Sequence, residues 1–255
     1  MIGRLYLALI YLFVCGPAAL IVFDSFNSAT SFPSPFEHIT LHWYRAILEH
    51  QEFLDAMRIS AIVAAAAAAL ATALSVPAAY ALTRRKLRGA DALATLLVGP
   101  LLVPQIVMGL AMLQLLSLAH IQLGLGGLIA VHAVYVMPFT VRLALTGLAR
   151  FDFALTEAAK SLGAGRLRTF WHVTLPLIRT SVIAGFTFAF ILSFVDLPLS
   201  LFLTTPRTAT LPVAVFAYIE SRLDPLVAAI GALILFAAVG LTLTLERVFR
   251  LRIVG

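Results

Sequence analysis

Residues 59–83 read ISAIVAAAAAALATALSVPAAYALT, a run of 25 residues without a charged side chain between Arg58 and Arg84. A helix rises about 1.5 Å per residue, so this run is long enough to cross the roughly 30 Å hydrocarbon core of a bilayer. Because each unpaired peptide group in lipid costs several kcal/mol, a crossing segment of this kind is helical. The sequence therefore predicts a transmembrane helix, and its many alanines allow neighbouring helices to approach closely.

The composition of the whole chain agrees with this stretch. Of the 255 residues, 62% are hydrophobic and 12% are charged, whereas a soluble protein has about 45–50% and about 25%. A soluble globule of this size could not bury so much apolar surface, and a disordered chain would need low hydrophobicity and high charge. The composition therefore excludes both classes and predicts an all-α integral membrane protein.

Further uncharged runs extend the prediction to six transmembrane helices. The run between Asp91 and Arg142 is too long for one crossing, and the glycine-containing stretch 120–127 divides it in two. The other predicted spans lie between Arg4 and Asp24, between Arg58 and Arg84, between Arg179 and Arg207 with Asp196 inside, and between Asp224 and Glu246. Four prolines favour kinks, which are typical of helices that line transporter cavities, although polytopic helices tolerate proline generally. They are Pro77, Pro100, Pro104 and Pro138.

Basic residues predict the orientation of these spans. Six crossings place both termini on one side, and Lys and Arg are concentrated on the cytoplasmic side of membrane proteins. With cytoplasmic termini, that side holds 13 of the 18 basic residues: Arg4, Arg84, Arg85, Lys86, Arg88, Arg150, Lys160, Arg166, Arg168, Arg179, Arg247, Arg250 and Arg252. Since the charges cluster in loops between apolar runs, they indicate membrane topology, and no nucleic-acid partner is expected.

The predicted spans divide the chain into four parts. Residues 1–24 are expected to form an uncleaved N-terminal helix because no small-residue cleavage site follows, with a cleaved signal peptide as the alternative. Residues 25–56 form an extracytoplasmic loop, whose amphipathic stretch 41–48 carries Trp43 and Tyr44, both suited to the membrane interface. Residues 57–247 form the main bundle with a cytoplasmic loop at 148–180, and residues 248–255 form a cytoplasmic tail.

The loop at 148–180 has the pattern of an ordered segment with its own helix rather than that of a simple connector. Asp152 can cap a helix start, and apolar residues recur on one helix face at Leu155, Ala158, Ala159 and Leu162. Gly163 predicts a helix stop, and Pro176 can open the next helix because its missing N–H would be unpaired there anyway. We expect a short surface helix, a turn and a stiff lead into a transmembrane helix, which could transmit motion from a docked partner.

The same loop resembles the EAA signature of permease subunits of ABC-type importers, which reads E-A-A-x3-G-x9-I-x-L-P. Here Glu157-Ala158-Ala159 is followed after three residues by Gly163 and after nine more by Val173-Thr174-Leu175-Pro176, with Val173 in place of isoleucine. The likeness runs from about Ala56 to Glu246, through Ser60, residues 78–82, Pro100, Pro104 and residues 138–142. It implies the methionine-importer permease fold, with a five-helix core of spans two to six plus the first span, in the bacterial inner membrane.

The resemblance also implies roles and partners. The helix around Glu157 would dock in a groove of a cytoplasmic ATPase subunit, with Glu157 as polar anchor, Ala158 and Ala159 permitting close contact, and Gly163 making the turn. Leu175 and Pro176 complete the signature. The alternative is that these residues only pack the loop against its own bundle. The implied partners are two ATP-binding cassette subunits, a second permease subunit in a heterodimer, and an extracytoplasmic solute-binding protein.

Several motifs are absent from the sequence. There is no G-x-x-x-x-G-K-[ST] to hold ATP phosphates, so ATP would be bound by a partner and the chain needs no cofactor of its own. Nor is there an H-E-x-x-H, a G-x-S-x-G or a Cys/His cluster with metal-ligand spacing. We therefore predict no catalytic residues, no metal site and no enzyme activity; His120 and His132 are interpreted as hydrogen-bonded packing residues. An ion-coupled secondary transporter or a channel remains the alternative function, although such carriers often show inverted repeats.

Asp196 is the acid predicted to lie within a membrane span, so it should face protein or a water-filled cavity. One interpretation is a translocation-path residue for a cationic substrate. The other is a structural ion pair or a hydrogen bond at a helix break near Pro198. Ser193-Phe194, Asp196 and residues 201–203 and 210–212 resemble the family branch that serves polyamines such as spermidine and putrescine, with related members for ferric iron and phosphonates. Leu197 stands where many polyamine permeases have a second acid, and a polyamine is one candidate for the small solute.

Overall fold

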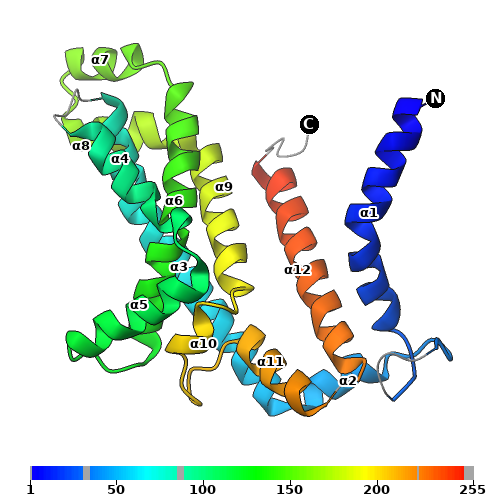
Figure 1. Ribbon diagram of the computed structural model, residues 1–255. Coiled ribbons are helices and arrows are strands. Elements are labelled where there is room, and N and C mark those ends of the chain that lie inside the picture. The colour runs from blue at the N-terminus through cyan, green and yellow to red at the C-terminus, as the bar shows by residue number, and fades with distance from the viewer. Residues whose placement is uncertain (1, 31–34, 85–88, 223, 250–255) are drawn as a thin grey trace. The chain divides into compact units, whose positions relative to one another are not determined.

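The computed structural model describes residues 2–30, 35–84, 89–222 and 224–249, whose secondary structure is helical apart from one isolated bridge between Asn27 and Ile39 (Figure 1). The helices are α1 (Ile2–Asp24), α2 (His42–Glu49), α3 (Gln51–Arg84), α4 (Ala90–Val98), the 3-10 turn η1 (Gly99–Leu102), α5 (Gln105–Leu118), α6 (Leu125–Ala149), α7 (Ala154–Ser161), α8 (Arg166–Thr169), the π-helical turn η2 (Phe170–Thr174), α9 (Leu175–Phe194), α10 (Ser200–Leu203), α11 (Leu211–Ser221) and α12 (Leu226–Phe249). Arg85, Lys86 and Arg88 of the predicted basic turn and residues 250–255 of the predicted tail lie outside the described residues.

Among the described residues, four helical stretches are long and apolar enough to cross a bilayer: Gln51–Arg84, Leu125–Ala149, Arg166–Phe194 and Leu226–Thr244. A fifth crossing results if Ala92–Leu102 and Gln105–Leu118 are counted as one bent span. The prediction of an all-helical membrane protein is confirmed, with four to five candidate spans. α1 coincides with the first predicted span, and Leu9–Asp24 is an apolar stretch of its described residues.

The bent span turns by 109° between Leu102 and Gln105. Pro104 has no N–H to donate, and its ring disfavours helical backbone at Val103, which is extended. The kink predicted at the prolines of this span is thus confirmed, whereas α3 and α6 continue through Pro77 and Pro138. The predicted division of the long run is also confirmed, since α5 ends at Leu118 and α6 begins at Leu125.

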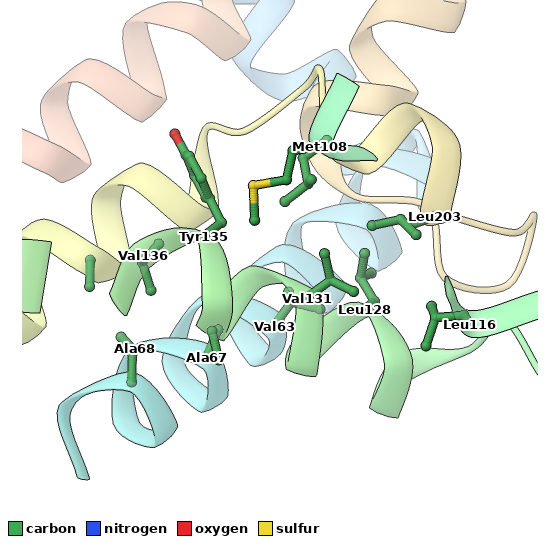
Figure 2. Packing of buried hydrophobic residues seen from close by; sticks show 14 residues of the cluster. Val63, Ala67, Ala68, Met108, Leu116, Leu128, Val131, Tyr135, Val136 and Leu203 are labelled. Atoms are coloured by element: carbon green, nitrogen blue, oxygen red, sulfur yellow. The ribbon is translucent and has the colours of Figure 1, made fainter. Parts of the chain in front are cut away.

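The residues Ile59–Thr210 form one compact unit with an apolar core. Figure 2 shows part of this core, to which α3, α5, α6 and α10 all contribute. The labelled side chains are Val63, Ala67, Ala68, Met108, Leu116, Leu128, Val131, Tyr135, Val136 and Leu203. A buried polar contact adds to it, because the hydroxyls of Ser75 on α3 and Thr140 on α6 lie 2.6 Å apart. The alanine-rich stretch 59–83 therefore lies against α6.

The residues Met1–Arg58 and Leu211–Gly255 form the second compact unit. The amphipathic stretch that was predicted before α3 is α2, with Trp43 and Ile47 buried. The indole of Trp43 donates to the backbone oxygen of Asn27 at 2.7 Å, and the side chain of Asn27 accepts hydrogen bonds from the N–H groups of Ala29 and Glu37. The described residues between α1 and α2 are thus organised around Asn27.

We expect Gly109→Ala to destabilise the first unit. A Cβ atom at Gly109 would lie 2.9 Å from Cδ2 of Phe202 and 3.3 Å from the backbone oxygen of Leu199, so α5 approaches the segment around α10 too closely for a side chain. Overpacking of this kind costs about 1–3 kcal/mol. Thermal unfolding in detergent measures the effect, and Gly126→Ala, where a Cβ would meet nothing within 4 Å, is the matched control. Equal melting temperatures for the two variants would contradict this packing.

Candidate functional site

The first candidate site is the signature loop, residues 148–180, and its centre is α7. The carboxylate of Asp152, one residue before the N-cap Phe153, accepts a hydrogen bond from the N–H of Ala154 at 2.9 Å, so α7 begins close to the predicted start. At the other end, the N–H of Gly163 bonds to the oxygen of Lys160 and that of Ala164 to the oxygen of Ala159. Gly163 has φ +86°, the left-handed conformation that such a helix end requires. The predicted surface helix and its glycine stop are therefore both present.

The apolar face predicted for α7 points outward. Leu155 is exposed, Leu162 is 89% exposed, and Ala158 is exposed while Ala159 is partly covered. Leu167 and Trp171, further along the loop, are exposed as well. Ala158 and Leu162 are therefore not used to pack the loop against its own bundle, and the loop presents an apolar surface that the described residues leave open.

The opposite side of α7 is anchored to the bundle. Thr156 is fully buried and donates its hydroxyl to the backbone oxygen of Phe153. The ring of Tyr80, near the end of α3, lies 6.4 Å from that of Phe153 and 5.4 Å from that of Phe170. Beneath these rings lies a cluster of buried residues from α3, α6 and α9: Val76, Ala79, Ala144, Leu148 and Ile178. The aromatic contacts therefore fix the loop to three helices of the bundle.

Glu157, the first residue of the signature, is held by two cations. Its carboxylate pairs with Arg84 at the end of α3 and accepts a hydrogen bond from Lys160 at 3.1 Å. The hydrogen bond from Lys160, together with the positive charges of Lys160 and Arg84, lowers the pKa of the Glu157 carboxyl below its ordinary value. Arg84 also donates to the hydroxyl of Tyr80. Sequence reasoning missed the link from Tyr80 through Arg84 to Glu157, because Arg84 and Glu157 are 73 positions apart and no local pattern pairs them.

The loop leads into α9 without a break. Pro176 is at the second position of α9, as the sequence predicts for a helix-opening proline. The π-helical turn η2 precedes it, with the N–H of Leu175 bonded to the oxygen of Phe170, and α8 precedes η2. Because α8, η2 and α9 follow one another directly from Arg166 to Phe194, the stiff lead that was predicted is longer than the sequence indicated.

The second candidate site is the break after α9, and here one prediction was wrong. Asp196 does not lie inside a helix: α9 ends at Phe194 and α10 begins at Ser200. The reason is that Pro198 cannot donate to the helix ladder, and Asp196 replaces the missing backbone partners. One of its oxygens, Oδ2, accepts the N–H of Ser200 at 3.1 Å and its hydroxyl at 3.2 Å. The interpretation of Asp196 as the acceptor of a helix-break hydrogen bond agrees with this geometry.

Asp196 nevertheless keeps one oxygen uncommitted. The residue is only 4% exposed, and Oδ1 has no hydrogen-bond partner among the described residues. His132 on α6 is buried and bonded to two serines near the break, which agrees with its interpretation as a hydrogen-bonded packing residue. Within the described part of the chain, no group of three or more His, Cys, Asp or Glu residues could hold a metal ion.

The family follows from comparison with known proteins. Residues 71–253 match the model of the binding-protein-dependent transport system inner membrane component. The chain belongs to this family. It is therefore a permease component of a binding-protein-dependent ABC importer, a multi-pass protein of the inner membrane, and not itself catalytic. An ATPase and a solute-binding protein are the partners that such an importer requires, and membership of the family decides against the ion-coupled carrier and the channel.

Individual relatives cover nearly the whole chain. The spermidine/putrescine transport system permease protein PotC of Escherichia coli K12 is 30% identical over 254 residues, which are 98% of this chain and 96% of the relative. The putrescine transport system permease protein PotI of the same strain is 31% identical over 238 residues, 91% and 84% of the two chains. Among solved structures, a bacterial alginate ABC transporter in complex with an alginate pentasaccharide-bound periplasmic protein matches with a TM-score of 0.72 at 14% identity, covering 97% of this chain and 93% of that one. This last likeness shows the fold alone.

We expect Tyr80→Ala to loosen α7 from the bundle. The variant removes two ring contacts and the hydroxyl that Arg84 bonds, and each aromatic pair contributes about 0.5–1.5 kcal/mol, so α7 should open about tenfold more often. Amide hydrogen exchange of the 152–164 segment measures this, and Tyr11→Ala, which removes an exposed ring on α1, is the control. Unchanged exchange in Tyr80→Ala would show that the ring does not anchor the loop.

Proposed function

We propose that this chain imports a small organic cation of the polyamine class and is driven through the signature loop by two ATP-binding cassette subunits in the cytoplasm. The observation that carries the proposal is the two-sided construction of α7. One side is anchored through Phe153 and Thr156, and the other presents Leu155, Ala158 and Leu162 to the surroundings. A surface that is apolar, exposed and rigidly held is suited to bind a partner at low entropic cost.

Each residue of the signature has a proposed task in this docking. Ala158 and Ala159 have no bulk beyond Cβ, so a groove of the ATPase can approach the backbone of α7 closely. Glu157 remains 63% exposed despite its two cations, so its carboxylate can also bond to the partner. Gly163 turns the chain, and Leu175 and Pro176 begin the helix that receives the motion.

In the proposed cycle, ATP binding closes the two ATPase subunits and draws the docked loops together, and the attached bundles turn toward the outside. Hydrolysis restores the inward-facing state. Nucleotide and loaded binding protein can drive this change only by favouring one of the two states over the other. The continuous path from α8 to α9 supports the idea that displacement of the loop reaches the membrane part of the chain.

We propose the following arrangement in the membrane. The chain crosses six times with both termini in the cytoplasm, residues 1–24 as the N-terminal helix and residues 25–56 as an extracytoplasmic segment. Residues 57–247 form the permease with its five-helix core, and residues 248–255 form the tail. The distribution of Lys and Arg supports this orientation. A second, different permease subunit would complete the pathway as a heterodimer.

The solute is inferred from two observations. The permeases of spermidine/putrescine and putrescine transport match the chain at 30% and 31% identity. In addition, Asp196 keeps Oδ1 without a partner, and a free carboxylate oxygen at a helix break is suited to accept an ammonium group. We therefore propose Asp196 as a residue of the translocation path that interacts with a cationic solute.

Two substitutions in the loop test the docking. Glu157→Lys reverses the charge of the anchor, and Gly163→Asp places a side chain and a negative charge at the left-handed turn that ends α7. We expect both variants to lose the ATPase when the tagged chain is purified in detergent after coexpression with its partners. The loss is scored by the amount of ATPase recovered for each amount of permease.

Matched controls are available for both substitutions. Glu220→Lys makes the same charge reversal at an exposed acid on α11. Gly165→Asp places the same side chain at a glycine with φ −65°, in open space just before α8, where Asp is an accepted cap. Both controls should recover the ATPase as the unmodified chain does. Recovery of the ATPase with Glu157→Lys and Gly163→Asp would refute docking through α7.

Asp196→Asn tests the solute. Asparagine retains an oxygen that can bond to Ser200 but carries no charge, so the assembled importer should remain stable while uptake of radiolabelled putrescine falls about tenfold. The same substitution at Asp224, another carboxylate that accepts a backbone N–H at a helix start, is the control and should leave uptake unchanged. Full putrescine uptake by the Asp196→Asn variant would show that Asp196 is not a residue of the translocation path.

A further inference from the structure

We propose that His132 is a positioning residue that fixes both ends of the break between α9 and α10 to α6, and that transport depends on this attachment. His132 is fully buried, and its two ring nitrogens bond to serines on opposite sides of the break. Nδ1 lies 2.8 Å from the hydroxyl of Ser193, in the last turn of α9. Nε2 lies 3.2 Å from the hydroxyl of Ser200, the first residue of α10.

For a neutral imidazole, the direction of these hydrogen bonds follows from the number of protons. Ser200 has one hydroxyl proton and donates it to Oδ2 of Asp196, so its oxygen accepts from the ring. A neutral imidazole has one donor and one acceptor. Nε2–H therefore donates to Ser200, and Nδ1 accepts from the hydroxyl of Ser193. The result is one directed chain of hydrogen bonds, in which each shared proton has a single donor. It runs from Ser193 through His132 and Ser200 to Asp196.

The break needs such an attachment because its backbone is not helical between α9 and α10. In a membrane protein, non-helical backbone is tolerated only where protein or a water-filled cavity satisfies it. Ser193 and Ser200 are both buried, and removal of the imidazole would leave their hydroxyls without this bridge. The bridge also sets the position of Asp196, because Ser200 bonds to both His132 and the carboxylate.

Packing confines the break but does not replace the hydrogen bonds. Leu199 and Leu203 are buried in the core together with Met108 of α5 and Val131 of α6, and Figure 2 shows Leu203, Met108 and Val131 in this cluster. Apolar contacts are not directional, so they allow α10 to slide or rotate against its neighbours. The two bonds of His132 remove this freedom. The inference concerns the break itself and does not depend on which solute is carried or on a role for Asp196 in binding it.

The test compares variants that separate hydrogen bonding from shape. His132→Phe keeps a ring but can make neither bond, and His132→Gln keeps a donor and an acceptor on a flexible chain. Spin labels are attached to cysteines at Leu110 on α5 and Leu201 on α10, both exposed, in a Cys15→Ser background of the assembled importer. The distance distribution between the labels reports the freedom of the break, and binding-protein-stimulated ATP hydrolysis and putrescine uptake report function.

We expect His132→Phe to broaden the distance distribution and to lower uptake per ATP hydrolysed about tenfold, whereas His132→Gln restores a narrow distribution and most of the uptake. Ser75→Ala, which removes a buried hydroxyl contact between α3 and α6 away from the break, is the control and should change neither quantity. The single-atom variants Ser193→Ala and Ser200→Ala should each reproduce the broadening, even if His132→Phe does not assemble.

If these residues form one connected chain of hydrogen bonds, the effects of substituting them are not additive. The double variant His132→Phe/Ser193→Ala should be no more impaired than His132→Phe alone, because the first change has already broken the shared bond. A narrow distribution in His132→Phe, failure of His132→Gln to restore it, or multiplied losses in the double variant would each overturn the proposal. Because the distance readout does not involve the solute, failure of the polyamine assignment would leave it intact.

Discussion

In lipid, every backbone N–H and C=O must find its partner within the protein, and the rest of this structure depends on that constraint. It requires the long uncharged stretches to be helices, and it restricts departures from helix to places where other groups can substitute. The chain departs at Pro104, where its span turns by 109°, and at residues 195–199, where Asp196 accepts the N–H of Ser200. The helix that follows the first departure packs against the second, since Gly109 of α5 lies against Leu199 and Phe202.

One helical stretch connects the two candidate sites. From Arg166 the chain runs through α8, the π-helical turn and α9 to Phe194, directly before the break that holds Asp196. Its first residues carry the exposed Leu167 and Trp171 beside α7, and its last turn carries Ser193, which bonds to His132. A continuous helical stretch with an exposed apolar surface at one end and a hydrogen-bonded break at the other is suited to the proposed transmission of displacement between a partner and the membrane part of the importer.

The sequence predicted the features that depend on local pattern. The uncharged runs gave the places of four to five candidate spans, Asp152 and Gly163 gave the approximate limits of α7, and Pro176 gave the start of α9, because each of these signals acts within a few residues. The break at Asp196 was one of two interpretations left open, since Pro198 and one acid are compatible both with a kinked helix and with an interrupted one. The orientation of the apolar side of α7 was likewise undetermined, because a stripe of leucine and alanine can face a bundle or a partner.

Pairings between distant parts of the chain could not be predicted. Arg84 and Glu157 are 73 positions apart, and His132 is 61 positions from Ser193 and 68 from Ser200. Such pairs leave no local signal in a single sequence, and they depend on how α3, α6 and α9 pack. The residues that hold the loop and the break therefore came from the structure, while the residues that define the family came from the sequence.

The central claim is that the outward side of α7 contacts the ATPase directly. A photo-crosslinker attached to a cysteine at Ala158, in a Cys15→Ser background of the working importer, tests this contact. Ala158 lies on the exposed side of α7, where we propose that the ATPase binds. The account predicts that illumination joins an ATPase subunit covalently to the permease labelled at Ala158. The same crosslinker at Leu118, which is exposed at the end of α5, should not capture the ATPase. Crosslinks from Ala158 only to lipid or to the permease itself would contradict the account.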